Sequence, residues 1–130
     1  MKFALVINEA PYSRQASESA YQFAKAVVAK GYTILSVFFY GDGVLNANTL
    51  ACPPQDEAHI INRWSAFAKG HHITLSVCVA SCLRRGILDE TLSRQYDKTT
   101  HNLAAEFTIT GLGTLAEAYH QADRVILFGG

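Results

Sequence analysis

The feature that most constrains the fold of this chain is an alternation along the sequence. Short apolar runs alternate with longer segments in which apolar residues recur at helical spacing. The first run, residues 3–7 (FALVI), has no polar interruption, as expected for a strand that is covered on both faces. From about Ser13 the period changes, and apolar residues recur along one helical stripe until Gly31, which suits a helix C-terminal cap. Residues 33–40 (TILSVFFY) are β-rich again. This order predicts a strand, a helix and a second strand.

The same alternation continues to the end of the chain. Pro53-Pro54 marks a rigid turn, and Asp56 is expected to cap a helix that Gly70 ends. The further elements expected along the chain are a strand at 73–79, a turn or short helix through 84–86, a polar helix from Asp89, a strand at 106–110, a helix at 112–122 and a strand at 125–128. The whole chain, residues 1–130, is therefore expected to be one α/β domain with a mostly parallel sheet and helices on both faces.

The composition of the chain excludes several classes of protein. Of its 130 residues, 49% are hydrophobic and 17% are charged, which is enough to fill one core and argues against disorder. Eleven basic residues balance eleven acidic ones, so no positive field attracts nucleic acid or an anionic membrane. No stretch approaches the roughly 20 apolar residues that span a bilayer, and the N-terminus lacks the apolar run of a secretory signal. We therefore expect a cytoplasmic protein without nucleic-acid or membrane partners.

Cys78 is the candidate reactive residue. It lies near the carboxyl end of the third predicted strand, and reactive groups of open α/β sheets gather at this edge. Free amide groups of a following helical turn, together with Arg84 and Arg85, would favour thiolate, the nucleophilic form of cysteine. The alternative is a buried structural cysteine, because free cysteine often packs as a small hydrophobic residue. The position alone leaves both interpretations open.

The other two cysteines and the histidines predict no second site. Cys82 follows Cys78 by one helical turn, so it is either a resolving thiol or, as we favour, a small residue that fills a packed turn. Cys52 lies in a loop without an activating neighbour, and an odd number of cysteines without framework spacing indicates free thiols. No cysteine–histidine spacing matches a zinc site, and His71 and His72 are expected in a polar turn. No metal is therefore expected.

A glycine-rich segment, Gly111 to Ala116, imitates a dinucleotide-binding motif. It follows a predicted strand and opens a predicted helix. The true motif, however, lies in the first strand–helix unit and is followed about 20 residues later by an acidic residue, and no acidic residue has that spacing here. We therefore expect the glycines to permit a tight turn and close packing of helix and strand, and we expect no cofactor.

Five segments of the chain indicate a protein family more specifically than hydrophobic periodicity or residue spacing does. They are KFALVINEAPYSRQASESAYQFAKA, SVFFYGDGVLNAN, PPQDEAHIINRW, CVASCLRRGILDE and GLGTLAEAYHQADRVILFG. In this order they resemble the DsrE/TusD family of sulfurtransferases over nearly the full length, and the cysteine block followed by Arg-Arg-Gly is the most specific part. At Cys82 the chain departs from the family pattern, in which a small residue such as alanine is usual.

The resemblance implies a flavodoxin-like α/β fold and a role in sulfur relay. By motif, the conserved cysteine of the family falls on Cys78, which would accept a sulfane sulfur as a persulfide and pass it to an acceptor protein without a cofactor. The implied partners are two related, smaller subunits (TusB/TusC-like or DsrF/DsrH-like) in a heterohexamer, a TusA-like sulfur donor and a TusE/DsrC-like acceptor. In TusD-like members the sulfur serves 2-thiouridine synthesis in tRNA, which we expect here, and in DsrE-like members it serves dissimilatory sulfur oxidation.

Two other functions compete with sulfur relay. The chain would be a non-catalytic structural subunit of the same assembly if Cys78 were buried and inert. It would be a small-molecule or nucleotide-binding module if the turn at residues 111–113 held a ligand. Alkylation of Cys78 in the native protein tests the first alternative, and a thermal shift on addition of nucleotides tests the second.

Overall fold

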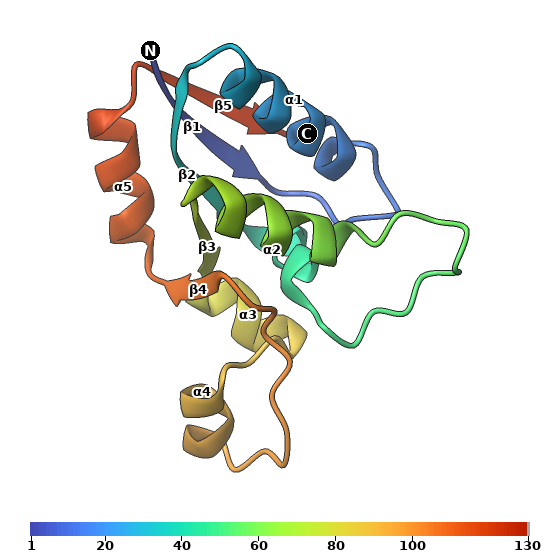
Figure 1. Cartoon of the computed structure of the whole chain (residues 1–130). Helices are drawn as coiled ribbons and strands as arrows, with labels where there is room; N and C mark the ends of the chain where they lie inside the picture. The colour runs from blue at the N-terminus through green and yellow to red at the C-terminus, as the bar shows by residue number, and fades with distance from the viewer. Residues whose placement is uncertain (130) are drawn as a thin grey trace.

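The computed structural model describes residues 1–129, which form a five-stranded, all-parallel sheet in the order β4-β3-β2-β1-β5 (Figure 1). The strands are β1 (Lys2–Ile7), β2 (Thr33–Phe39), β3 (Thr74–Cys78), β4 (Phe107–Thr110) and β5 (Arg124–Phe128). The helices are α1 (Ala16–Ala29), the 3₁₀ helix η1 (Gly41–Ala47), α2 (Ile60–His71), α3 (Val79–Arg85), α4 (Glu90–Gln95) and α5 (Leu112–Gln121). The predicted α/β fold is confirmed, and none of the described helices is long and apolar enough to cross a membrane.

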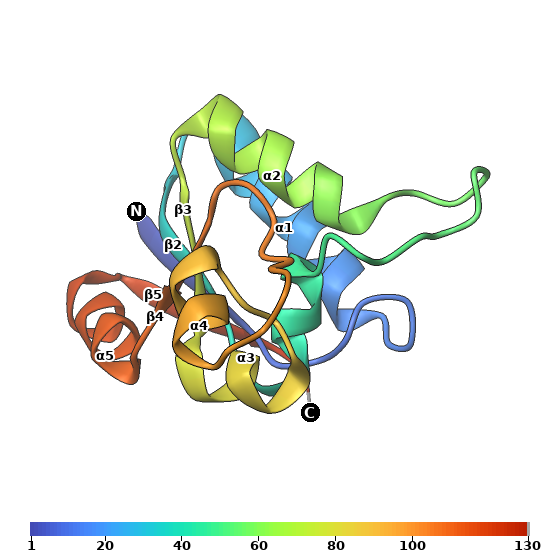
Figure 2. The same ribbon diagram turned by 90° about the horizontal axis from the view of Figure 1, so that it is seen from below.

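Helices cover both faces of the sheet, as the order of the strands requires. From β1 to β2 and from β2 to β3, the chain moves across the sheet towards the same edge. Right-handed crossovers therefore place α1 and α2 on the same face. The connection from β4 to β5 runs back across the sheet in the opposite direction, and the same rule places α5 on the other face. Figure 2 shows α1 and α2 together on one side of the strands and α5 on the other. The predicted two-sided arrangement is confirmed.

The larger core lies between the sheet and the pair of helices α1 and α2. At its centre is Trp64, which is fully buried and meets the rings of Phe39 and Tyr21 edge-on, at centroid distances of 5.4 and 5.3 Å. Alternate strand residues such as Leu75 and Val77 point into this core, because side chains of a strand alternate between its faces. The residues between them face the α5 side of the sheet.

The ends of α2 differ from those predicted. Its N-cap is His59, whose Nδ1 accepts a hydrogen bond of 3.3 Å from the backbone of Asn62, so the predicted cap at Asp56 is wrong. At the other end the helix continues through Gly70 and is capped by His72, which takes a left-handed backbone with φ of 54°. A left-handed residue is the common way to end a helix, although glycine usually supplies it.

The segment between α3 and β4 leaves the sheet, carries α4 and is held by Asn102 (Figure 1). The Asn102 Nδ2 donates to Asn48 Oδ1 at 2.9 Å and to the Gly86 carbonyl at 3.1 Å. Its Oδ1 accepts from the Leu88 amide at 2.9 Å. Within the segment, the polar helix predicted from Asp89 is confirmed as α4, and the Asp89 side chain caps it. These bonds fasten the segment against the ends of η1 and α3.

Gly43 packs against the end of β1 too closely for a side chain. A Cβ atom at Gly43 would lie 2.1 Å from the carbonyl oxygen of Ile7. Gly111 and Gly113 differ from Gly43, because a Cβ atom at either position meets no atom within 4 Å. The predicted close packing of helix and strand at these two glycines is therefore wrong, and α5 begins at an open turn.

The substitution Gly43→Ala is expected to lower the free energy of unfolding by about 1–3 kcal/mol, the usual effect of overpacking. The matched control is Gly113→Ala in the first turn of α5, which should be neutral or should raise stability by up to about 1 kcal/mol, because alanine has the higher helix propensity. Urea denaturation gives the free energy of unfolding of both variants. Equal stability of the two would contradict the close contact at Gly43.

Candidate functional site

Cys78 is the last residue of β3 and the N-cap of α3, so it lies at the carboxyl edge of the sheet, as predicted. The strand ends one residue earlier than expected, because Val79 already belongs to α3. The Cys78 side chain faces the α5 side of the sheet and accepts no capping hydrogen bond from the amide groups of α3. Cys78 is only 3% exposed. Another sulfur can therefore reach Sγ only if the neighbouring atoms move.

The two arginines that follow Cys78 have different surroundings. Arg85 Nε donates to Asp42 Oδ1 at 2.8 Å, and its Nη1 donates to the Ser81 carbonyl at 3.2 Å. The charge of Arg85 is therefore largely balanced, and its side chain joins α3 to η1. Arg84 is exposed and has no acidic partner among residues 1–129. The uncompensated positive charge on α3 thus belongs to Arg84.

The other cysteines have clearly different environments. Cys82 is fully buried in the larger core, and this burial, with a further contribution from the nearby Cys78, raises the pKa of its thiol to about 12. It is therefore a protonated thiol at neutral pH, which agrees with a small residue that fills a packed turn. Cys52 is exposed in the loop before the two prolines, and all three cysteines are free.

Two surface clefts differ in their relation to Cys78. The larger, of about 370 Å³, lies between the starts of α1 and α2 and is lined by no cysteine. The smaller, of about 310 Å³, is lined by residues of α4 and by Val79 and Thr110. Val79 follows Cys78 in the chain, and Thr110 is its partner on β4. Cys78 itself lines neither cleft, and the smaller one is adjacent to it through these two neighbours.

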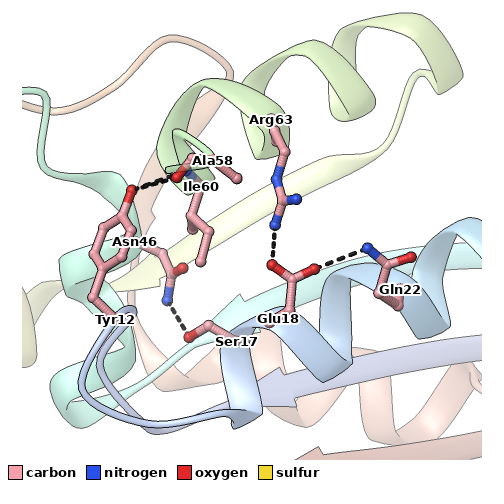
Figure 3. Close-up of polar contacts among 8 residues, drawn as sticks. All are labelled: Tyr12, Ser17, Glu18, Gln22, Asn46, Ala58, Ile60 and Arg63. Atoms are coloured by element: carbon pink, nitrogen blue, oxygen red, sulfur yellow. Dashed lines mark hydrogen bonds and ion pairs between the residues drawn. The ribbon is translucent and has the colours of Figure 1, made fainter. Parts of the chain in front are cut away.

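A polar cluster borders the larger cleft (Figure 3). The Tyr12 hydroxyl donates to the Ala58 carbonyl at 3.0 Å and accepts from the Ile60 amide at 3.1 Å. Tyr12 has a left-handed backbone with φ of 71°, and α1 begins only at Ala16, later than the predicted Ser13. The cluster joins the loop before α1 to the loop before α2.

An ion pair between Glu18 and Arg63 joins α1 to α2 in the same cluster (Figure 3). Gln22 Nε2 donates to the Glu18 carboxylate at 2.8 Å. This bond, together with the Arg63 guanidinium, outweighs partial burial and lowers the pKa of Glu18. The Arg63 guanidinium also lies over the Tyr21 ring, 4.3 Å from its centroid. The cluster is thus a structural connection between the two helices.

Two hydroxyl groups on the face of Cys78 are buried and have no hydrogen-bond partner among the described residues: Thr110 Oγ1 and Ser76 Oγ. Thr110 is paired with Cys78 in the register of β3 and β4, and Ser76 precedes Cys78 by one strand repeat. Neither residue is identifiable as part of the site from the sequence, because strand register and burial depend on contacts between distant segments. The only signal in the chain is that a threonine ends a predicted strand at the same edge.

The glycine-rich segment contributes to the smaller cleft without forming a special turn. Gly111 is the N-cap of α5 and lines the cleft, and its φ of −87° with ψ of 177° is open to any residue. Across residues 1–129, no three histidine, cysteine or acidic side chains converge in a way that would hold a metal ion.

Cys82 is expected to resist iodoacetamide in the native protein at roughly pH 7 to 9, because its thiolate forms only as the pH approaches about 12. The exposed Cys52 should react under the same conditions and serves as the internal control. Peptide mass mapping after timed labelling gives the two rates. Labelling of Cys82 as rapid as that of Cys52 would contradict its burial.

Glu18→Gln is expected to lower the free energy of unfolding by about 0.5–1 kcal/mol at neutral pH. The folded-state pKa of Glu18 lies below the ordinary value of 4.5, so its carboxylate stabilises the fold above that value and loses this effect as the pH falls through the folded-state pKa. Denaturation at pH 7 and at about pH 3 should therefore show a difference that shrinks in acid. Glu57→Gln, at an exposed carboxylate without an ion pair, is the control. A difference that is equal at both pH values would contradict this role of the carboxylate.

Comparison with known proteins identifies the relatives of this chain. It matches the model of the DsrE/DsrF-like family over residues 1–128. A DsrE protein of Allochromatium vinosum, named as a candidate sulfurtransferase, is 54% identical over 99% of both chains. Sulfurtransferase TusD homologues of Vibrio vulnificus and Vibrio parahaemolyticus are 44% and 46% identical over 98% of both chains. The crystal structure of the YchN protein of E. coli has the same fold, with a TM-score of 0.79 at 20% identity, and the match covers 98% of this chain and 99% of that one. The predicted resemblance is confirmed, and the chain belongs to the DsrE/DsrF-like family.

Proposed function

We propose that this chain is a sulfurtransferase subunit of a sulfur relay, in which Cys78 carries a sulfane sulfur as a persulfide. The observation that carries the proposal is the position of Cys78 at the carboxyl edge of a parallel sheet, beside a cleft of about 310 Å³. Relatives named as sulfurtransferases support the reaction class. Of the other cysteines, Cys82 is protonated in the core and Cys52 lies in an exposed loop, which leaves Cys78 as the candidate carrier.

The proposed reaction consists of two thiol exchanges. The Cys78 thiolate attacks the outer sulfur of a donor persulfide, the bond between the two donor sulfurs breaks, and the donor thiolate leaves with the electron pair. A cysteine of the acceptor then attacks the outer sulfur on Cys78, and Cys78 leaves as a thiolate. Each exchange forms one sulfur–sulfur bond and breaks one, so the overall oxidation level is unchanged and no redox cofactor is required.

The main physical requirement of this reaction is that the donor sulfur can reach Cys78. Because Cys78 is 3% exposed, a donor must displace neighbouring atoms before its persulfide meets Sγ. Ala80 is exposed and Val79 is half-buried, so the junction of β3 and α3 itself lies at the surface. The junction and the adjacent cleft provide the most direct approach to the sulfur.

The proposed partners are two related, smaller subunits (TusB/TusC-like or DsrF/DsrH-like) in a heterohexamer, a TusA-like donor and a TusE/DsrC-like acceptor. Uncovered apolar side chains support an assembly: Leu112, Tyr119 and Leu127 are 54%, 54% and 56% exposed. A net charge of zero offers little repulsion between such surfaces. A cytoplasmic location suits the three free cysteines.

The proposed destination of the sulfur is 2-thiouridine at the tRNA wobble position, in line with the TusD homologues among the relatives. Dissimilatory sulfur oxidation is the second candidate, and the 54% identity to the DsrE relative favours it. Deletion of the gene separates the two. Loss of 2-thiouridine from tRNA supports the first pathway, and loss of growth on reduced sulfur with intact 2-thiouridine supports the second.

Two rival functions make different predictions. A structural subunit with an inert Cys78 would show native alkylation of Cys78 that is slow and no faster than in the denatured chain. A nucleotide-binding module would show a thermal shift on addition of nucleotides, for which the open turn at Gly111 is the only support. Neither rival predicts that sulfur is transferred to the protein.

The decisive variant is Cys78→Ser, compared with the wild type after incubation with a persulfidated donor. Wild type is expected to gain the mass of one sulfur atom, reversibly on addition of a reductant, and Cys78→Ser is expected to gain none. Intact mass spectrometry measures both. Cys82→Ser and Cys52→Ser are the matched controls and should load as the wild type does. Sulfur gained by Cys78→Ser would instead assign the carrier role to one of the other cysteines.

A further inference from the structure

The Thr110 hydroxyl is the feature next to Cys78 that the two thiol exchanges do not use. We propose that Thr110 Oγ1 donates a hydrogen bond to the outer sulfur of the Cys78 persulfide, which makes Thr110 a second catalytic residue of the transfer. This inference rests on the proposed function, because it requires that Cys78 carries the sulfur. Thr110 lies outside the segment CVASCLRRGILDE, which contains Cys78.

The register of the sheet places Thr110 beside Cys78. The two residues are direct partners on the parallel strands β3 and β4, which lie about 4.8 Å apart in such a sheet. Val77 and Phe107 point into the larger core, so Cys78 and Thr110 both face the α5 side. No other residue of β4 lies directly opposite Cys78.

The Thr110 hydroxyl keeps a donor that no described residue uses. Thr110 Oγ1 is buried and forms no hydrogen bond with the Cys78 sulfur or with any other described atom. A buried hydroxyl without a partner is unfavourable, and most native structures avoid it. In the persulfide, the outer sulfur lies about 2 Å beyond Sγ, so it extends the reach of the cysteine side chain. An acceptor at that point would satisfy the hydroxyl.

The cleft beside Cys78 provides space for the additional sulfur. Thr110, the strand partner of Cys78, and Val79, the next residue in the chain, both line this cleft of about 310 Å³. The outer sulfur of a persulfide ionises readily, and hydrogen bonds to ionised acceptors are roughly twice as strong as those between neutral groups. Asp89 lines the same cleft and accepts from the Leu92 amide at 2.8 Å, but an ionised carboxylate has no hydrogen-bond donor to offer. Thr110 therefore supplies the donor that favours the loaded anion.

Ser76 is a control for whether any buried hydroxyl on this face of the sheet would have the same effect as Thr110. The Ser76 hydroxyl is also buried and has no hydrogen-bond partner within residues 1–129, on the same face and strand as Cys78. Ser76 lies one strand repeat before Cys78, however, opposite Thr108, and it does not line the cleft. Removal of the Ser76 hydroxyl should therefore leave the loaded state unchanged, which makes Ser76→Ala the matched control.

The step itself needs only a hydrogen bond from Thr110. The Cys78 thiolate attacks the outer sulfur of glutathione persulfide, the sulfur–sulfur bond of the donor breaks, and glutathione thiolate leaves with the electron pair. The new persulfide on Cys78 then loses its proton to solvent, and the Thr110 hydroxyl donates to the resulting anion. No proton passes through Thr110, and no oxidant or reductant is required.

The test measures the equilibrium between the full-length protein and defined ratios of glutathione persulfide to glutathione, by intact mass. Thr110→Val, which keeps the shape but removes the hydroxyl, is expected to lower the loading constant about ten-fold. Thr110→Ser, which keeps the hydroxyl, and Ser76→Ala should stay within about two-fold of the wild type. Alkylation of unloaded Cys78 should be unchanged in Thr110→Val, because the hydroxyl forms no hydrogen bond with the resting thiol.

Each outcome of this test is decisive. If wild type loads at Cys78 and Thr110→Val loads equally well, the role of Thr110 is wrong while the proposed function stands. If Thr110→Ser loses as much loading as Thr110→Val, or if Thr110→Val alters alkylation of the unloaded cysteine, the effect is structural and the inference also fails. If wild type gains no sulfur at Cys78, the proposed function fails, and the inference fails with it.

Discussion

The hydrogen bonding of β3 between β2 and β4 is the constraint on which the candidate site depends. β3 pairs with β2 through Val77 and with β4 through Cys78, so the position of every side chain along it is set by two neighbours. A shift of one residue in this register would turn Cys78 into the larger core and bring Val77 to the other face. The parallel alignment also brings the carboxyl ends of all the strands to one edge, where Cys78 meets Thr110.

The face of the sheet, rather than the degree of burial, separates Cys78 from Cys82, because both thiols are buried. Cys78 and Cys82 are one helical turn apart, yet Cys82 lies in the larger core and Cys78 lies at the edge of the opposite face. Loss of hydration in the core disfavours the thiolate, so Cys82 stays protonated. Arg85 contributes by attaching the last turn of α3 to η1 through Asp42. The chemistry of the site therefore follows from the side of the sheet that each sulfur faces.

The parts of the fold that could be predicted are those whose signal is local and repeated. The buried run at residues 3–7 and the stripe before Gly31 carry their periodicity over many residues, and both elements are present. The cap at Asp56 was wrong because a cap depends on the backbone angles of one residue, and His59 satisfies the first turn of α2 instead. The packing expected at Gly111 was wrong for a related reason, because only the neighbouring chain shows whether a Cβ atom has space.

The sequence by itself determined that this chain forms an α/β fold, that it belongs to its family, and that Cys78 lies at the end of the third strand. These conclusions depend on hydrophobic period and on motif order, which are properties of continuous segments. Only the tertiary structure decided that Cys78 is nearly covered, that Cys82 is enclosed by the core, and that a threonine distant in the chain lies beside the candidate cysteine. The physical reason is that burial and strand register arise from contacts between distant segments, and no local pattern in the chain encodes which segments meet.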